Sequence, residues 1–295
     1  MRIILFSRSR IARSAEELRQ LFGAVRASGF DFILNREFAE AVQSLLGETF
    51  PPERIYGERL GPQPEGTTMI CYGGDGTLLE GVHRLGGAPI PVLGINAGHL
   101  GFLTGAPNEG IGQILGQVAR GELSIQPRTM LDVRGGFADG TESGLALNEF
   151  TVRRHGAGML SVETFVDGQL AATYHGDGVI VSTPTGSTAY SLSAGGPVVA
   201  PSCACLIVSP LAPHNLAMRP VVIPDTAVIV LRVHERQSDA FVTLDNRIHP
   251  VGPDASFTVR RAEQKIFLAL PHNISFYDTL RNKMMWGADL RKAKE

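Results

Sequence analysis

The sequence predicts two domains of different classes, an α/β domain over residues 1–124 and an all-β domain over residues 125–272. In the first, short apolar runs alternate with segments of helical spacing, which is typical of a parallel sheet with helices on its faces. In the second, helical spacing is scarce and short apolar runs follow one another between turns, which favours two packed antiparallel sheets. Helical spacing returns in residues 273–295, and we expect this C-terminal segment to pack back on the first domain.

The first domain is expected to begin with a strand at Ile3–Ser7, a short apolar run. Ser14 and Glu17 have the spacing of a capping box, so they predict the start of a helix with one apolar face. The same alternation then predicts the strand Phe30–Leu34, the helix Glu37–Leu46, the strand Thr67–Tyr72, a helix from Leu78 and the strand Pro91–Ile95.

The second domain is predicted from short apolar runs, each bounded by turn-forming residues. The helical spacing that marks the first domain returns only after them, in Ser275–Leu290. The predicted strands are Met130–Val133, Ala146–Val152, Ser161–Val166, Val179–Ser182, Cys205–Val208, Ala227–Val233, Ala240–Leu244, Ser256–Val259 and Ile266–Leu270.

Composition limits the classes of function. Hydrophobic residues make up 43% of the 295-residue chain and charged residues 19%, which is typical of a globular protein and excludes a disordered one. The net charge of −2 gives no bulk attraction to nucleic acid or to an acidic membrane surface. Cys71, Cys203 and Cys205 form no disulfide or zinc pattern. No apolar run is long enough for a membrane span or a signal peptide, so we expect a soluble cytoplasmic protein with no nucleic-acid or membrane partner.

The turn Gly73-Gly74-Asp75-Gly76-Thr77 connects a predicted strand to the helix that follows. At the carboxyl ends of parallel strands, glycines let backbone N–H groups approach phosphate oxygens, and a helix N-terminus favours anions. A carboxylate among such glycines needs a further task. Asp75 suits two: accepting a proton from an attacking hydroxyl, or holding Mg²⁺ between phosphates. A tight Asp-Gly turn with a helix-capping aspartate explains the same residues equally well.

A second motif, Asp177–Pro197, leads from a buried strand into small and hydroxyl-bearing residues. Tyr190 adds a ring face on which a base can stack. This composition favours a ligand loop over a solvent-facing turn, although such turns are also rich in hydroxyls. The hydroxyls belong to Thr183, Thr185, Ser187, Thr188, Ser191 and Ser193.

Asn148 and Glu149 interrupt an apolar run. Burying them costs free energy unless their polar atoms are bonded, and their donors and acceptors together suit a diol such as a ribose. An edge-strand position facing water explains the pair as well. From the sequence alone this second interpretation is favoured.

Four motifs together resemble those of the NAD kinase family, over most of residues 67–223. Gly73–Thr77 resembles the family's glycine-rich box, which has relatives in diacylglycerol kinases, sphingosine kinases and phosphofructokinases. Gly94–Thr104 resembles its loop N-x-G-x-L-G-F-L-T, and Asn148-Glu149 and the highly specific run Asp177–Pro197 follow in the same order. The resemblance implies a Rossmann-like α/β domain and a C-terminal β-sandwich. It also implies transfer of the terminal phosphoryl group of ATP to the 2′-hydroxyl of the adenosine ribose of NAD, giving NADP.

The resemblance implies roles for individual residues. Asp75, between Gly74 and Gly76, would be the base, with Mg²⁺ or another divalent cation on ATP and no residue implied as a direct metal ligand. Asn148 and Glu149 would form hydrogen bonds with a ribose of NAD and with atoms close to its phosphates. Phe102 would line the adenine pocket, and Asp177 would reach the carboxamide or a ribose. Ala212 would contact the second half of NAD, in an oligomer across a subunit contact. The residues implied to hold the adenine and nicotinamide ends are Thr188, Ala189, Tyr190, Ser191, Leu192 and Ser193.

Two positions depart from the family pattern. His175 stands where family members often carry arginine, two residues before the Asp-Gly pair, so the contact to pyrophosphate and the preference between NAD and NADH are open. Arginine is permanently charged, whereas histidine titrates near neutral pH. In the later loop, Arg247 stands where the family commonly has glutamine. It could restore positive charge near phosphate, but a solvated hairpin residue is the favoured interpretation.

Two other classes of function remain as alternatives. The first is a kinase of the same superfamily that acts on a lipid or a sugar alcohol; the compact, hydroxyl-rich run after Asp177 disfavours it. The second is a regulator that binds dinucleotides without turnover, which the retained Asp75 disfavours. The sequence leaves open whether ATP or inorganic polyphosphate is the donor, and whether NADPH or NADP regulates the protein. The resemblance implies a homodimer or a homotetramer.

Overall fold

A computed structural model describes residues 1–8, 14–58, 60–96, 101–107, 110–156, 158–234, 240–252, 254–272 and 274–287. The chain divides into two compact units. The first comprises Met1–Pro127 with Ile266–Glu295, and the second is Arg128–Lys265. The chain passes from one unit to the other within the strands β7 (Leu123–Arg134) and β18 (Ser256–Pro271).

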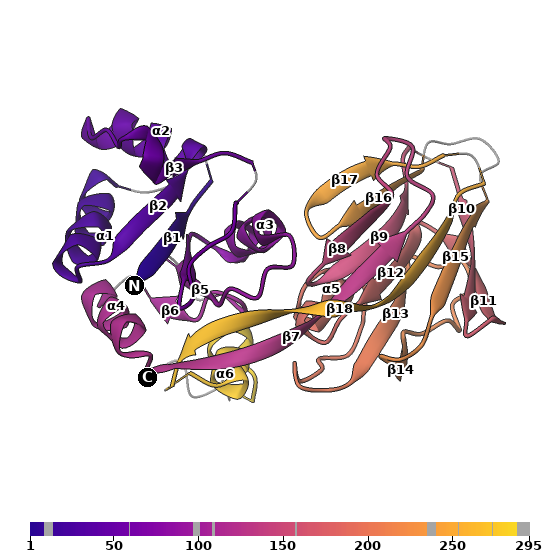
Figure 1. Ribbon diagram of the computed structural model, residues 1–295. Helices are drawn as coiled ribbons and strands as arrows, with labels where there is room; N and C mark the ends of the chain where they lie inside the picture. The colour runs from indigo at the N-terminus through magenta and orange to yellow at the C-terminus, as the bar shows by residue number, and fades with distance from the viewer. Residues whose placement is uncertain are drawn as a thin grey trace. The chain divides into compact units, whose positions relative to one another are not determined.

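The first unit is built on a parallel sheet, as the alternating sequence pattern predicts (Figure 1). Ile4 of the central strand lies opposite Ile33 on one side and Met69 on the other. The strand order is β18-β5-β4-β1-β2-β3, with β6 beside β5. The bounds are β1 Arg2–Phe6, β2 Asp31–Asn35, β3 Ile55–Tyr56, β4 Thr68–Tyr72, β5 Val92–Asn96 and β6 Ala106–Pro107.

Helices cover both faces of this sheet. The core on one face joins α1 (Ala15–Ala27), α2 (Arg36–Leu46) and α4 (Ile111–Arg120) to alternate residues of the strands. On the other face, Gly81 of α3 (Asp75–Leu85) lies against the side chains of Cys71, Met69 and Phe6. The unit also contains the 3-10 turn η1 (Pro52–Arg54) and α6 (Phe276–Met284).

The structure differs from the sequence prediction at two of these helices. The helix expected from Leu78 begins at Asp75, because the turn enters it directly: the Thr77 and Leu78 N–H groups already donate to Gly74 O, at 2.8 and 3.2 Å. Helix α4 was not predicted. Its apolar residues do have helical spacing, and three glycines around its start and middle obscure the pattern.

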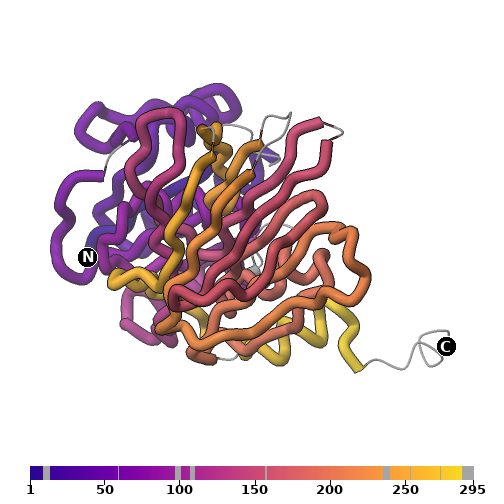
Figure 2. Tube along the Cα trace, turned by 90° about the vertical axis from the view of Figure 1, so that its right-hand side faces the viewer, coloured from indigo at the N-terminus to yellow at the C-terminus, as the bar shows by residue number. Residues whose placement is uncertain are grey.

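The second unit is antiparallel, as predicted, and its strands lie side by side in magenta and orange (Figure 2). One run of paired strands is β11-β10-β15-β18, and the other sheet is β14-β13-β12-β9-β16-β17. Buried residues of both, such as Val162 and Val181, belong to one hydrophobic core. The bounds are β8 Ser143–Ala146, β9 Glu149–Arg154, β10 Leu160–Val166, β11 Gln169–Gly176, β12 Gly178–Ser182, β13 Cys205–Leu211, β14 Val221–Pro224, β15 Ile229–His234, β16 Ala240–Leu244 and β17 Arg247–Pro250.

The runs Ser256–Val259 and Ile266–Leu270, expected as two strands, form the single strand β18. The predicted C-terminal helix is shorter than its sequence pattern and ends at Met284. Among the residues described, no helix has both the length and the apolar character needed to cross a membrane.

Candidate active site

Asp75 stands at the carboxyl edge of the parallel sheet, where β4 ends and α3 begins. The turn before it is held to the next strand, because Gly73 N–H donates to Ile95 O at 2.9 Å. This is the edge at which open α/β sheets bind ligands. The Asp75 side chain is 28% exposed and therefore accessible to a substrate.

The Asp75 carboxylate is fixed by the segment Phe102–Thr104. Oδ1 accepts from Leu103 N–H (3.2 Å), Thr104 N–H (3.1 Å) and the Thr104 hydroxyl (3.0 Å). Oδ2 accepts from Phe102 N–H at 2.9 Å. A carboxylate oxygen has about two lone-pair positions, so Oδ1 is saturated and Oδ2 retains capacity for one further donor, such as a hydroxyl group.

Gly101 is required by this arrangement. A Cβ atom at Gly101 would overlap Asp75 Oδ1 and the Thr104 hydroxyl, so the loop can approach the carboxylate only without a side chain there. The motif Gly94–Thr104 therefore serves to hold Asp75, a role the sequence analysis missed. Its residues 97–100 lie outside the described part of the chain.

Two cations flank the glycine-rich turn. Arg8 donates from its guanidinium to Gly76 O at 2.5 Å. Lys283, on α6, places Nζ 3.7 Å from Asp75 Oδ2 and 4.9 Å from the centre of the Phe102 ring. Neither residue was predicted, because both are distant from the motif in the sequence.

In the second unit, Asn148 and Glu149 are buried, with exposed fractions of only 6% and 7%. The interpretation of an edge-strand pair facing water is wrong: Glu149 opens β9, which lies between β12 and β16 in the sheet. Asn148 Oδ1 and Glu149 Oε2 are buried without a hydrogen-bond partner among the residues described. Unpaired buried polar atoms are costly, so these two atoms are candidates for bonding a ligand.

The pKa of Glu149 is raised to about 8, chiefly by burial and also by the nearby charge of Asp245, against the opposing effect of a hydrogen bond from the Tyr190 backbone. At neutral pH this carboxyl group therefore carries a proton for most of the time, and it can donate as well as accept a hydrogen bond.

Asp245 supports this pair from the turn between β16 and β17. Its carboxylate accepts from the N–H groups of Leu147 (2.9 Å), Asn148 (2.7 Å) and Glu149 (3.1 Å). Burial nevertheless raises the pKa of Asp245 above its usual range. Three bonds to one carboxylate fix the backbone that carries Asn148 and Glu149.

The run Asp177–Pro197 uses most of its hydroxyls inside the protein. Thr183 donates to Leu147 O at 2.6 Å, Ser187 to Val199 O at 3.2 Å, and Ser191 lies 3.1 Å from the Ser209 hydroxyl. These hydroxyls are buried and form no binding surface, contrary to expectation. They stabilise the 3-10 turn η2 (Thr185–Thr188) and the short helix α5 (Tyr190–Ser193), which leave Ser193 exposed and Thr188, Ala189, Tyr190 and Leu192 half-buried.

His175, Asp177 and Ala212 lie together, because Gly178 pairs with Leu211 between β12 and β13. His175 and Ala212 are exposed, and Asp177 accepts from Arg154 Nε at 2.7 Å. Arg153 lies 5.3 Å from the centre of the Tyr190 ring, so one face of that ring contacts a cation.

Arg247 is not the solvated hairpin residue that was favoured: it is half-buried and donates to Leu145 O at 2.6 Å.

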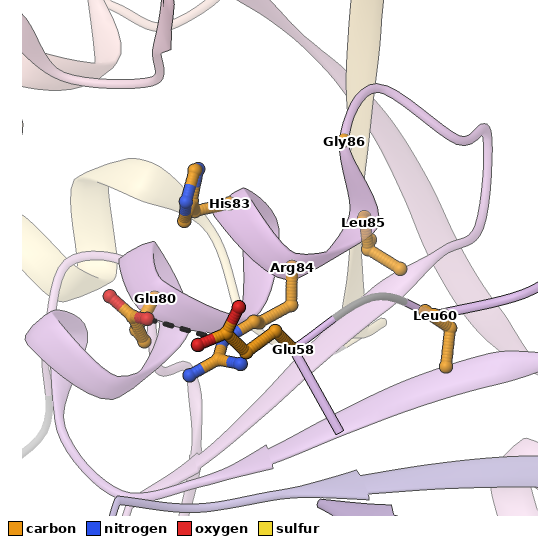
Figure 3. Close-up of a pocket in the computed structure, with 7 residues that line it drawn as sticks. All are labelled: Glu58, Leu60, Glu80, His83, Arg84, Leu85 and Gly86. Carbon is orange, nitrogen blue, oxygen red and sulfur yellow. Dashed lines mark hydrogen bonds and ion pairs between the residues drawn. The ribbon is translucent and has the colours of Figure 1, made fainter. Parts of the chain in front are cut away.

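A pocket of about 560 Å³ lies at the opposite end of α3 (Figure 3). Arg84 there is paired with Glu80 at 3.3 Å, and its other pocket neighbours include Glu58 and His83. None of the predicted site residues lines this pocket. The residues predicted for the site lie instead in two regions that are described separately, the Asp75 edge of the first unit and the surroundings of Glu149 in the second.

Comparison with known proteins gives one family. Residues 65–123 match the model of the ATP-NAD kinase N-terminal domain, and residues 147–269 match that of the C-terminal domain. An NAD kinase of Bacteroides fragilis is 35% identical over 292 residues, covering 99% of this chain and 100% of the relative.

Two solved structures share the fold. Yeast NADH kinase complexed with NADH has a TM-score of 0.83 at 22% identity, covering 99% of this chain and 89% of that one. An NAD kinase from Archaeoglobus fulgidus in complex with ATP has a TM-score of 0.71 at 24% identity, covering 97% and 98%. The family models and the bacterial relative set aside a lipid or sugar-alcohol kinase. The chain belongs to the NAD kinase family, the enzymes that phosphorylate NAD.

Proposed function

We propose that Asp75 is the general base for transfer of the γ-phosphoryl group of ATP to the 2′-hydroxyl of the adenosine ribose of NAD. The observation that carries this role is the carboxylate itself: four hydrogen bonds fix it at the sheet edge, and only Oδ2 can accept another donor. A general base must lie within hydrogen-bond reach of the proton that it removes. A hydroxyl bonded to Oδ2 meets that condition.

The step balances with these groups. The 2′-oxygen forms a bond to the γ-phosphorus, the bond from that phosphorus to the bridging oxygen of ADP breaks, and the hydroxyl proton moves to Asp75 Oδ2. NADP and ADP are the products. In such reactions positioning and charge compensation supply most of the rate, which agrees with a base held by a rigid loop.

The second unit is proposed to bind the NAD substrate. Asn148 Oδ1 and Glu149 Oε2 have no partner within the described part of the chain, and a protonated Glu149 adds a donor, so the pair can bond both hydroxyls of a ribose. Contacts of Phe102, Asp177 and the half-buried residues after Thr185 with NAD are proposed from the family resemblance. The proposal excludes Arg247 and the Ser191 hydroxyl, whose polar groups bond within the chain.

A divalent cation fits the donor side of this proposal. Mg²⁺ usually keeps several waters and binds substrate phosphates together with one or two carboxylates. The described residues contain no cluster of three metal-ligating side chains, and the turn offers the single carboxylate of Asp75. The donor's own phosphates would therefore hold the ion and carry it into the site, where it would offset their charge.

We also propose that the chain forms a homo-oligomer through its second unit. Strand β14 is an edge strand, and its Val221 and Val222 are exposed, as is Leu216 shortly before it. Exposed apolar edges of this kind are usually covered. Light scattering of the purified protein tests this: a monomeric mass at micromolar concentration would contradict it.

A product assay tests the proposed reaction. The protein is incubated with NAD, Mg²⁺ and ATP, and NADP is measured with an NADP-specific dehydrogenase. In Asp75→Asn, the amide oxygen can keep the three bonds made by Oδ1, but the amide nitrogen cannot take a proton. We expect turnover to fall on the order of a thousandfold while NAD binding, measured by calorimetry, is retained.

The matched control is Asp254→Asn, which removes an exposed carboxylate elsewhere in the chain. Unchanged turnover in Asp75→Asn would contradict the role of Asp75. If the wild type binds NAD but makes no NADP with ATP, the same assay with inorganic polyphosphate distinguishes a different donor from a regulator without turnover.

A further inference from the structure

The ammonium group of Lys283 lies at the proposed reaction centre. Nζ is 3.7 Å from Asp75 Oδ2, which is the oxygen left with capacity for a substrate hydroxyl. The Lys283 side chain is 37% exposed, so its charge is available to a ligand. Both residues belong to the first unit, although the family model for the N-terminal domain ends at residue 123.

Helix α6 is built to hold Lys283 in this place. Ser275 and Asp278 form a capping box at its start, and Thr279 and Leu280 are buried. Lys283 follows these two buried residues by four and three positions, so it starts from the same side of the helix, with its side chain 37% exposed. Arg281 pairs with Asp278 and is more exposed, at 59%.

Asp75 does not need Lys283 to stay in position. Four hydrogen bonds from Phe102–Thr104 already orient the carboxylate, and an ion pair as exposed as this one contributes little stability. The lysine charge is therefore available for another group that arrives at the same oxygen.

We propose that Lys283 is a catalytic residue that binds the phosphoryl group during its transfer; this rests on the proposed role of Asp75. A hydroxyl bonded to Oδ2 lies about 3 Å from it, and the phosphorus under attack lies about 3–3.5 Å from the hydroxyl oxygen. The phosphorus is then within about 6–7 Å of Oδ2 by the same distances. An ammonium 3.7 Å from Oδ2 reaches the phosphoryl oxygens by a rotation of its side chain.

The proposed role of Lys283 is to stabilise negative charge on the phosphoryl group. Charge spreads over the three outer oxygens of the phosphoryl group as it moves between the donor and the acceptor oxygen, and a fixed cation stabilises it there. Lys283 takes no part in the proton transfer, since the hydroxyl proton goes to Asp75. Because the contact strengthens as the transfer proceeds, its loss lowers kcat more than it weakens NAD binding.

Steady-state kinetics of three variants test this proposal. Lys283→Met removes the charge and keeps most of the stem, Lys283→Arg keeps the charge, and Arg281→Met removes a charge from the exposed side of the same helix. We expect kcat to fall on the order of a hundredfold in Lys283→Met with the KM for NAD within about threefold of the wild type. Lys283→Arg should recover at least a tenth of wild-type kcat, and Arg281→Met should match the wild type.

Several results would overturn the assignment. A kcat for Lys283→Met within twofold of the wild type would remove Lys283 from the reaction while leaving Asp75→Asn as the test of the base. A raised KM for NAD at unchanged kcat would show a binding role only. If Lys283→Met and Lys283→Arg both melt well below the wild type and lose activity together, the residue is structural and the proposal is wrong.

Discussion

Each unit carries one acid to which we propose a role, and the two acids are held in opposite ways. In the first, the chain itself supplies four donors to the Asp75 carboxylate, which remains 28% exposed. In the second, Glu149 is almost fully buried, and its Oε2 has no partner among the described residues. The Asp245 charge beside it adds to the cost of ionisation.

This difference separates two tasks. A group that must meet a reacting atom is best fixed before the substrate arrives, because the cost of orienting it has then been met by folding. A group that must recognise a substrate can be left unpaired, because the binding partner restores the missing bond and an unsuitable molecule does not. Asp75 has the features of the first kind, and Asn148 and Glu149 have those of the second.

The largest effect is expected from a variant that displaces the Asp75 carboxylate while Asp75 itself is kept. In Gly101→Ala the new Cβ would overlap Asp75 Oδ1, so either the carboxylate or the loop must move. A displacement of about 1 Å at a reacting group costs on the order of a hundredfold in rate, and we expect kcat to fall by that factor. Steady-state NADP formation measures it.

Gly112→Ala is the matched control, because a Cβ there meets no atom within 4 Å. The KM for NAD should change little in either variant. A wild-type kcat for Gly101→Ala would mean that the orientation of Asp75 is not held by this loop.

The buried state of Glu149 can be tested by the pH dependence of protein stability. The pKa of Glu149 is raised to about 8 in the folded protein from 4.5 in the unfolded chain, so between these values folding must take up a proton. The contribution of Glu149 to the free energy of unfolding of the wild type is fully present below pH 4.5 and is lost as the pH rises through 8. The loss is at most about 1.4 kcal/mol per pH unit. Glu149→Gln carries no such titration.

We therefore expect the free energy of unfolding of Glu149→Gln to rise relative to that of the wild type by on the order of 2–4 kcal/mol between pH 5 and pH 8. Urea unfolding at the two pH values measures the change, with Glu142→Gln as a control for loss of an exposed carboxylate. Parallel stability curves for Glu149→Gln and the wild type would show that Glu149 ionises normally in its buried position.

Local patterns in the sequence were sufficient to predict most of the fold. The capping box at Ser14 is present, with Glu17 N–H donating to the Ser14 hydroxyl at 3.2 Å, and the alternation of strands and helices gives the parallel sheet. The same patterns predicted a buried strand before the glycine-rich turn that contains Asp75. These features depend on neighbours a few residues apart, which is why composition and spacing reveal them.

The features that were missed depend on residues far apart in the chain. The backbone N–H of Asn148 is bonded by Asp245, 97 residues later, and the Asp75 carboxylate is held by Thr104, 29 residues later. Arg247 donates a hydrogen bond to Leu145 O, 102 residues earlier, and no periodic pattern in the sequence predicts such a contact. Only the family resemblance connected the separate motifs with one function.

The smallest expected effect concerns His175, where the family pattern has arginine. His175 is exposed on β11, and its carbonyl accepts from His214 N–H at 2.8 Å, so an arginine side chain fits without displacing the strand. The nicotinamide ring is cationic in NAD and neutral in NADH. We expect a permanent charge at position 175 to disfavour NAD relative to NADH, provided that it lies within reach of that end of the substrate.

An exposed charge pair is worth about 0.2–1 kcal/mol, so the ratio of kcat/KM for NADH to that for NAD should rise about threefold in His175→Arg. Ala171→Arg places the same charge on an exposed position of the same strand and should leave the ratio unchanged. Raising the salt concentration should reduce the effect, because surface charges are screened. An equal ratio in His175→Arg and the wild type at low salt would place His175 away from the bound dinucleotide, and the exposed end of β11 would then be unconnected with the choice of substrate.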